Sequence, residues 1–191
     1  MSRFRSARRL WELKCAAAAG DEGAGPEAVP DLAMTRGRAL EPEARRRYGE
    51  LLGAEVAPLC CAHDQHRFLR ASLDGWCAAR QLPVEIKALR RTDHQEALRG
   101  RVPRRAVPQC LHILLVTGAA QMHYVSYQPD GFAPREQLAV VGLSADGPLL
   151  DELLLAERVF WDAVRAREPP PLPPLLSLSR LVTSRWRAAT G

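Results

Sequence analysis

The residues best suited to chemistry are the acid and the lysine of Glu85-Ile86-Lys87. Side chains two apart on an extended strand point to the same face, so Glu85 and Lys87 would lie side by side while Ile86 faces a core. A second carboxylate, Asp74, arrives from an Asp74-Gly75 pair that is typical of a turn. Carboxylates are preferred ligands of Mg²⁺, and an adjacent lysine can position a water or neutralise a phosphoryl oxygen. The pattern indicates metal-assisted phosphodiester hydrolysis.

The composition of the basic residues makes this lysine unusual. The chain has 27 basic residues, and all of them except Lys14 and Lys87 are arginines. A compact, titratable ammonium is not interchangeable with a guanidinium, so the lysine in Glu-x-Lys points to a chemical role. The alternative, which these residues alone leave open, is a solvated Glu85–Lys87 pair on a half-exposed strand.

Most of the net charge of +5 lies directly after the Glu-x-Lys segment. Between residues 90 and 107, six arginines stand against Asp93 and Glu96, for a local charge of +4. The six are Arg90, Arg91, Arg99, Arg101, Arg104 and Arg105. A basic segment beside a metal-type site fits contacts with a DNA phosphate backbone. An ordinary arginine-rich surface loop is the other interpretation.

Length and composition are typical of a globular intracellular protein. With 191 residues, of which 47% are hydrophobic and 26% charged, the chain is expected to form one domain with a real core. Its five cysteines form no Cys-x-x-Cys pair, and the N-terminus shows no secretory signal. No apolar run approaches the roughly 20 residues of a membrane span. We therefore expect a reduced, cytoplasmic protein that is not bound to a membrane.

Hydrophobic periodicity predicts the elements that position these residues. One helix is predicted to begin near Glu41, with Pro42 at its first helical position and Gly53 just past its end. Glu41 lies three residues before Ala44 and shares the apolar face of that helix, where a carboxylate needs a partner or a metal. The other predicted elements are helices at 4–14, 107–116 (ended by Gly118) and 149–167, and strands at 68–73, 82–89, 121–127 and 137–143.

This order of elements fits an α/β fold with a central mixed sheet flanked by helices. Residues 1–168 are expected to form the domain. Residues 169–191 begin with three prolines and end in a basic stretch, and are expected to be a tail that docks weakly or not at all.

Four segments and a following aromatic strand occur in an order that is typical of one family. They are residues 36–45 followed by Tyr48, residues 71–75 around Asp74, residues 84–87 with the Glu-x-Lys, residues 108–118 with Gln109 near the start, and the strand at 124–127. Together they resemble the lambda-exonuclease and YqaJ-type viral recombinase nucleases of the PD-(D/E)XK superfamily. The resemblance covers about residues 8–167 and implies a restriction-endonuclease-like core.

The resemblance implies a catalytic role for each matching residue. Asp74 and Glu85 would coordinate divalent metals, joined by the Ile86 carbonyl. Glu41 would approach the metal from the first helix, and Lys87 would orient or activate the attacking water. For Glu41, the alternative is a helix N-terminal carboxylate stabilised by the helix dipole.

The resemblance also implies cofactors, partners and a role for Gln109. Gln109 would support the lysine or the phosphate by hydrogen bonding, the alternative being a neutral amide on a helix surface. Mg²⁺ is the expected cofactor, with Mn²⁺ as a substitute, and no iron–sulfur cluster is expected because no cysteine follows Cys110. The expected partners are double-stranded DNA ends, a single-strand annealing protein and further copies of the chain in a homotrimer.

The leading hypothesis is a Mg²⁺-dependent phage or prophage 5′→3′ exonuclease that resects linear double-stranded DNA for single-strand annealing recombination. The chain starts close to the family's Leu-Trp segment, here Leu10-Trp11, so the domain is expected to be N-terminally shortened. One rival is a non-catalytic DNA-binding remnant with the same fold. Another is an endonuclease of the same superfamily, which would cut closed circular DNA.

Overall fold

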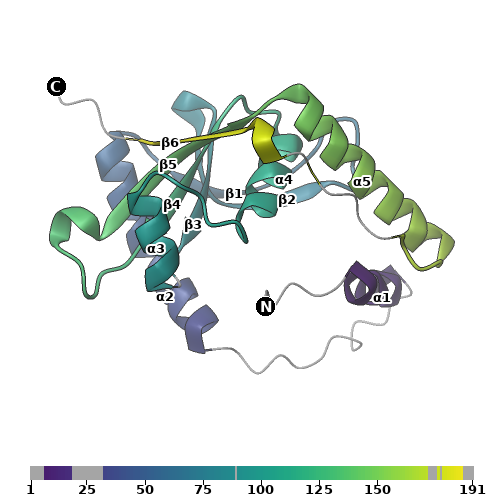
Figure 1. Cartoon of the computed structure of the whole chain (residues 1–191), viewed down its shortest axis with the longest axis horizontal. Helices are drawn as coiled ribbons and strands as arrows, with labels where there is room; N and C mark the ends of the chain where they lie inside the picture. The colour runs from purple at the N-terminus through teal and green to yellow at the C-terminus, as the bar shows by residue number, and fades with distance from the viewer. Residues whose placement is uncertain (1–6, 19–31, 89, 172–175, 177, 187–191) are drawn as a thin grey trace.

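A six-stranded sheet forms the centre of the protein (Figure 1). The computed structural model describes residues 7–18, 32–88, 90–171, 176 and 178–186. The strands lie in chain order across the sheet: β1 (Ala57–Ala62), β2 (Arg70–Cys77), β3 (Leu82–Lys87), β4 (Met122–Tyr127), β5 (Leu138–Ala145) and β6 (Leu181–Arg185). β3 and β4 are parallel, and the other neighbours are antiparallel. The central mixed sheet expected from the sequence is confirmed.

Helices cover both faces of this sheet. They are α1 (Ala7–Ala18), α2 (Leu32–Leu52), α3 (Arg91–Leu98), α4 (Val107–Thr117) and α5 (Gly147–Ala166). α2 packs on one face, where Tyr48 and Ala44 join Val84 and Ile86 in one core cluster. α4 packs on the other face and carries α5 on its outer side. α1 lies against α5, where the Trp11 indole donates a hydrogen bond to the Ala163 carbonyl at 3.1 Å.

The parallel pair β3–β4 is the most buried part of the sheet. Parallel strands require a crossover connection, and α3 and α4 supply it between β3 and β4. All six residues of β4 and the first five of β3 are buried, because α2 and α4 cover the two faces. Glu85 is therefore fixed in the interior rather than on a half-exposed strand.

The predicted start of the helix at Glu41 is wrong. α2 begins at Leu32 and places Pro42 in its interior, although its end at Leu52 and the positive φ of 66° at Gly53 agree with the prediction. Proline fits a first helical turn because it has no N–H, and the same property leaves the Arg38 carbonyl without its usual helical donor here. Packing of Ala44 and Tyr48 on the sheet holds the helix together across this defect.

The predicted turn at Asp74-Gly75 is also wrong, because both residues lie inside β2. The chain turns later, at Ala78–Arg80 and Gln81, where Gln81 has a φ of 49°. Gly75 serves close packing instead: a Cβ at this position would lie 2.6 Å from a methyl group of Val56. A glycine in a strand can mark a close approach as well as a turn.

Several elements were not predicted from the sequence. The edge strand β1 and the helix α3 were missed, the latter because the arginine-rich segment that contains it was interpreted only by its charge. Within the proline-rich C-terminal region, β6 pairs with β5 from Val141↔Arg185 to Ala145↔Leu181, which corrects the expectation of a weakly docked tail for those residues. Residues 19–31, between α1 and α2, lie outside the described residues.

The remaining predicted elements are present with small shifts at their ends. α4, β4, β5 and α5 match the predicted ranges closely, and Gly118 ends α4 with a φ of 64°. Within the described part of the chain, no helix is both long and apolar enough to cross a membrane.

Candidate active site

The site begins at a β-bulge in β2. Ala57 pairs with Trp76 and Leu59 pairs with Leu73, so two residues, Asp74 and Gly75, stand opposite the single residue Pro58. The alternation confirms the extra residue, because Leu73 faces the α4 side of the sheet and Cys77, four residues later, faces the α2 side. A bulge bends a strand and re-aims its side chains, so it directs the Asp74 carboxylate out of the regular ladder.

Beyond this bulge β2 and β3 separate. Their ladder runs from Cys77↔Leu82 to Gly75↔Val84 and stops before Asp74 and Glu85 would pair. The Ile86 amide instead donates a hydrogen bond to Asp74 Oδ2 at 2.8 Å. The aspartate side chain thus replaces a backbone partner and is held at the opening between the strands.

A cavity lies at this opening, between α2, the middle of β2 and the C-terminal end of β3. It is lined by Gly37, Arg38, Glu41, Asp74, Ile86, Lys87 and Ala88. Glu41, Asp74, Ile86 and Lys87 were all predicted as site residues, and the fold brings them together from three separate elements. The inward-facing acid of α2, Glu41, therefore lines the same cavity as Asp74 and Lys87 of the sheet.

Glu85 lies behind this cavity and is completely buried. Lys87 Nζ donates a hydrogen bond to Glu85 Oε1, while Glu85 Oε2 has no hydrogen-bond partner among the described residues. Burial raises the pKa of Glu85 to about 7; the charges of Asp74 and Glu41 add to this rise, and Lys87 opposes it. A buried carboxylate oxygen without a partner is costly, and such a group needs a functional explanation.

Lys87 is the cationic counterpart of this carboxylate. Burial would lower the pKa of its ammonium, but the adjacent Glu85, which also accepts its hydrogen bond, and Asp74 outweigh burial, so the pKa is raised. The Lys87 side chain is 28% exposed and lines the cavity, whereas the Glu85 side chain is 0% exposed. Lys87 is therefore the member of the pair that a substrate can reach.

Arg45 connects the acids of α2 and β2. Its Nη2 donates to Glu41 Oε1, one helical turn earlier, and its Nε donates to the main-chain carbonyl of Asp74. An inward-facing carboxylate was expected to need a partner or a metal, and Arg45 is a partner of Glu41. The alternative of a helix N-terminal carboxylate is excluded, because Glu41 lies in the middle of α2.

Gln109 is not brought into the cavity. It lies in the first turn of α4 with its side chain exposed, and no described hydrogen bond joins it to Lys87. Its neighbour Cys110 is buried close enough to Glu85 and Lys87 for their charges to affect its pKa, which burial raises. Gln109 is near the site, and its predicted support of the lysine or phosphate stays a prediction.

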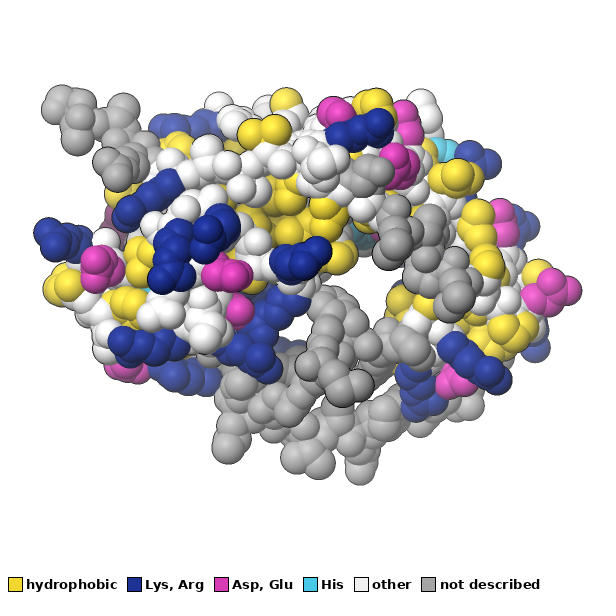
Figure 2. All heavy atoms as spheres, in the orientation of Figure 1, with side chains coloured by type: hydrophobic (Ala, Val, Ile, Leu, Met, Phe, Trp, Pro, Cys, Tyr) yellow, Lys and Arg dark blue, Asp and Glu magenta, His cyan; other side chains and the backbone are white. Residues whose placement is uncertain are grey.

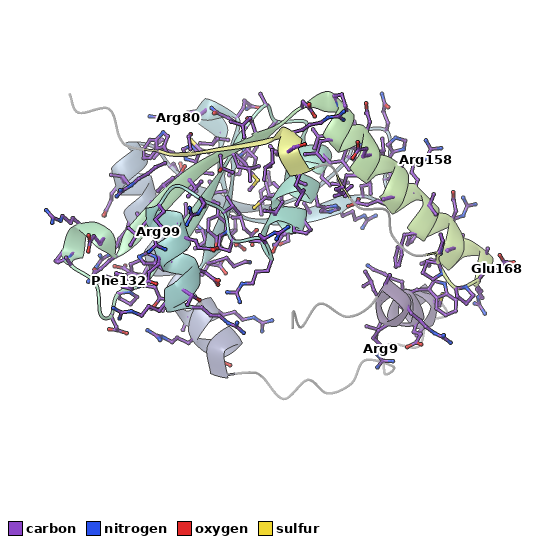
Figure 3. The ribbon with its side chains drawn as sticks, in the orientation of Figure 1. Arg9, Arg80, Arg99, Phe132, Arg158 and Glu168 are labelled. Carbon is purple, nitrogen blue, oxygen red and sulfur yellow. The ribbon has the colours of Figure 1, made fainter. Side chains whose placement is uncertain are left out.

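The basic segment forms the surface beside the cavity. Lys and Arg side chains gather over α3 and the adjoining part of α2 (Figure 2), and Arg90, Arg99, Arg101 and Arg104 are exposed. The other two predicted DNA contacts, Arg91 and Arg105, also interact with other residues of the protein, although Arg91 is exposed. Arg91 lies 4.8 Å from the centre of the Phe132 ring, and Arg105 pairs with Asp93. In Figure 3, Arg99 and Phe132 lie on the α3 side, far from Arg158 on α5.

Two arginines of the site were missed in the sequence analysis: Arg38, which lines the cavity, and Arg45, which bonds to Glu41 and Asp74. Arg38 lines the cavity, is exposed, and forms no ion pair with another described residue. It precedes Glu41 by three residues, a spacing that would have placed both on one helix face had the helix been predicted to start earlier. Arg45, four residues after Glu41, could have been found by the same spacing.

The donor chemistry fits a divalent cation. Two carboxylates line the cavity, and the buried Glu85 supplies a carboxylate oxygen without a hydrogen-bond donor. In the described parts of the chain, however, no three His, Cys, Asp or Glu side chains form a ready-made ion-binding group. Arg45 and Lys87 each bond to Oε1 of their carboxylate, Glu41 and Glu85, so Oε2 of each carboxylate is the atom that a cation would bind.

A mixed sheet whose central strands part between an aspartate and a Glu-x-Lys motif defines the restriction-endonuclease-like, PD-(D/E)XK class of fold. Residues 1–120 match the sequence model of the YqaJ-like viral recombinase domain. The match includes α2, the β2 bulge and the Glu-x-Lys strand, and the chain belongs to this family.

Solved structures agree with this assignment. The alkaline exonuclease LHK-Exo of Laribacter hongkongensis is 25% identical, with a TM-score of 0.73 over 87% of this chain and 84% of that one. The structure of LHK-Exo in complex with dAMP is likewise 25% identical, with a TM-score of 0.72 over 86% of this chain and 83% of that one. A phage-related exonuclease from Haemophilus somnus, 12% identical, shares the fold, with a TM-score of 0.60 over 87% and 91%. No curated protein matches the sequence.

Proposed function

We propose that this protein is a divalent-metal-dependent DNA exonuclease. The observation that carries the proposal is the cavity in which Glu41, Asp74 and Lys87 meet, with the unsatisfied carboxylate of Glu85 buried behind it. The similarity to an alkaline exonuclease that binds dAMP supports it, because dAMP is a nucleotide of the kind that exonucleolytic hydrolysis of DNA releases.

Asp74, Glu85 and the Ile86 carbonyl would hold the metal, with Glu41 approaching from α2. A divalent cation supplies Lewis-acid stabilisation of the phosphoryl oxygens and activates water for attack. Asp74 is already fixed by the Ile86 amide, so this ligand needs little reorganisation. Glu85 gains a positive partner for its orphaned oxygen.

Lys87 orients or activates the attacking water beside the scissile phosphate. Arg38, at the cavity mouth, has a planar guanidinium suited to two parallel hydrogen bonds with a phosphate. Gln109, at the start of α4, supports the lysine or the phosphate. The exposed arginines next to and after α3 extend the positive surface along which duplex DNA would lie. Arg91 and Arg105 add positive charge to this surface while contacting Phe132 and Asp93.

The finer features of the proposal come from the family resemblance. They are the use of Mg²⁺ with Mn²⁺ as a substitute, 5′→3′ polarity, a role in single-strand annealing recombination with an annealing protein, a homotrimer, and a cytoplasmic location. Light scattering of the purified chain tests the trimer. Duplexes labelled at either the 5′ or the 3′ end test the polarity.

The central test is digestion of 5′-phosphorylated linear duplex beside covalently closed plasmid, with Mg²⁺ or EDTA, for wild type and Lys87→Ala. Loss of linear DNA alone, dependent on Mg²⁺ and absent in the variant, is the expected result. Cutting of the closed plasmid would indicate an endonuclease. Binding of DNA without any cleavage would indicate a non-catalytic remnant of the family.

A further inference from the structure

The β2 bulge leaves a main-chain carbonyl that needs a donor. Pro58 stands opposite Asp74 and Gly75 and has no N–H to give to β2. On the other side, the β2–β3 ladder has already ended at Gly75↔Val84. The Asp74 carbonyl therefore accepts from the Arg45 Nε, which comes from α2. A side chain from another layer of the protein completes the bulge.

The same guanidinium also holds Glu41. Arg45 is largely enclosed, with 16% of its side chain exposed, and its Nη2 donates to Glu41 Oε1. One planar group with fixed donor directions thus binds the carboxylate of one proposed metal ligand and the main chain of another. The bonds tie α2 to β2 at the point where both elements line the cavity.

We infer that Arg45 is a positioning residue that sets Glu41 against Asp74 and so determines the affinity of the site for divalent cations. The inference rests on the proposed metal-dependent function. Groups that hold metal ligands in place commonly change metal affinity by about 10–100-fold when removed. A lysine cannot reproduce the effect, because its single nitrogen lacks the separated donors that reach both partners.

The test measures Mn²⁺ affinity by isothermal titration calorimetry for the full chain, wild type, Arg45→Lys and Arg45→Met. The matched control is Arg46→Met. Arg46 is the next residue on α2, but it pairs with Glu43 and Glu50 and does not line the cavity. The expected result is a Kd for Mn²⁺ raised about 10–100-fold in both Arg45 variants and within about twofold of wild type in Arg46→Met.

Opposite outcomes overturn the inference. If Arg45 only offsets negative charge, Arg45→Met binds Mn²⁺ more tightly than wild type and Arg45→Lys binds equally well. If it only supports the fold, the melting temperature falls while the Mn²⁺ affinity stays constant. Circular dichroism confirms that each variant is folded, and Arg45→Lys keeps the charge and the aliphatic stem should Arg45→Met fail to fold.

Cleavage of linear duplex at increasing Mn²⁺ provides a second readout. A positioning role shifts the midpoint of the metal titration to higher concentration and leaves the maximal rate within a few-fold of wild type. An unchanged midpoint with a lower maximum would mean that Arg45 acts on the substrate instead. Wild type that binds Mn²⁺ but cleaves nothing contradicts the proposed function alone, and wild type that binds no Mn²⁺ overturns both.

Discussion

Two buried polar clusters lie on neighbouring strands at the centre of the sheet and differ in how well they are satisfied. In the first, Lys87 donates to Glu85, and Glu85 Oε2 has no partner among the described residues. In the second, His94 Nε2 donates to the Glu136 carbonyl at 2.6 Å and its Nδ1 accepts from the Ser126 hydroxyl at 2.9 Å. Ser126 stands directly opposite Lys87 in the β3–β4 ladder.

This difference in hydrogen bonding indicates that the Glu85–Lys87 cluster serves the reaction and that the His94 cluster stabilises the fold. Burial lowers the pKa of His94, so the imidazole is neutral and both of its ring nitrogens are bonded. In the Glu85–Lys87 pair, burial instead raises the pKa of Glu85 to about 7, and its buried Oε2 has no hydrogen-bond partner among the described residues. Natural proteins satisfy buried polar groups where stability is at stake and leave exceptions at functional sites.

The largest effect is expected from removing both charged groups of the Glu85–Lys87 cluster. In the double variant Glu85→Leu with Lys87→Met, cleavage of linear duplex should fall by about 10³-fold or more, because the site loses a ligand and its reactive cation. The free energy of unfolding, from urea titration, should not fall, since replacing a buried ion pair is often neutral or stabilising by about 1–4 kcal/mol. A folded double variant that still cleaves DNA contradicts the assignment.

A second buried histidine, His123, should make stability depend on pH. The Tyr48 hydroxyl is hydrogen-bonded to its Nδ1 at 2.8 Å, the Trp186 ring centre lies 5.1 Å away, and burial, aided by Arg80, lowers its pKa to about 4. The unfolded histidine titrates near 6.5, so its contribution is present above that pH and is lost as pH falls through 4, by about 3 kcal/mol. Urea unfolding from pH 7 to pH 4 measures it, and His123→Gln should show a shallower decline. An equal decline in both proteins would assign the loss to other groups.

Removing the satisfied cluster should cost stability and spare chemistry. His94→Ala leaves the Ser126 hydroxyl and the Glu136 carbonyl without their buried partner, and should lower the free energy of unfolding by about 2 kcal/mol. The rate of duplex digestion at 25 °C should stay within a few-fold of wild type when the protein is folded. A loss of cleavage as large as that of the double variant would show that both clusters belong to the reaction.

The smallest expected effect concerns Arg38, the cavity cation without an acidic partner among the described residues. Arg38→Gln should weaken binding of linear duplex about tenfold and reduce the slope of log affinity against log salt by about one. Fluorescence anisotropy in EDTA measures both quantities. Arg36→Gln is the control, because Arg36 is already paired with Asp130 at 2.6 Å and should change affinity much less. Equal losses in the two variants would mean general electrostatics rather than a specific contact.

The candidate site could be predicted from the sequence wherever local spacing decides it. The shared face of Glu85 and Lys87 follows from strand alternation, and the inward direction of Glu41 follows from helical periodicity. The interpretation of Asp74-Gly75 failed because a dipeptide that commonly forms turns can also form a bulge. Only the residue opposite, Pro58, and the packing of Val56 distinguish the two cases.

By itself the sequence determined the chemical groups, the local faces on which they lie, and the order of most of the elements that carry them, because these depend on contacts within one turn or one strand. The tertiary structure alone decided where β2 and β3 separate, how deeply Glu85 is buried, that Arg38 lines the cavity of Asp74, and that Arg45 bonds to the Asp74 carbonyl. Strand register, desolvation and contacts between layers arise from residues far apart in the chain, and no local pattern encodes them.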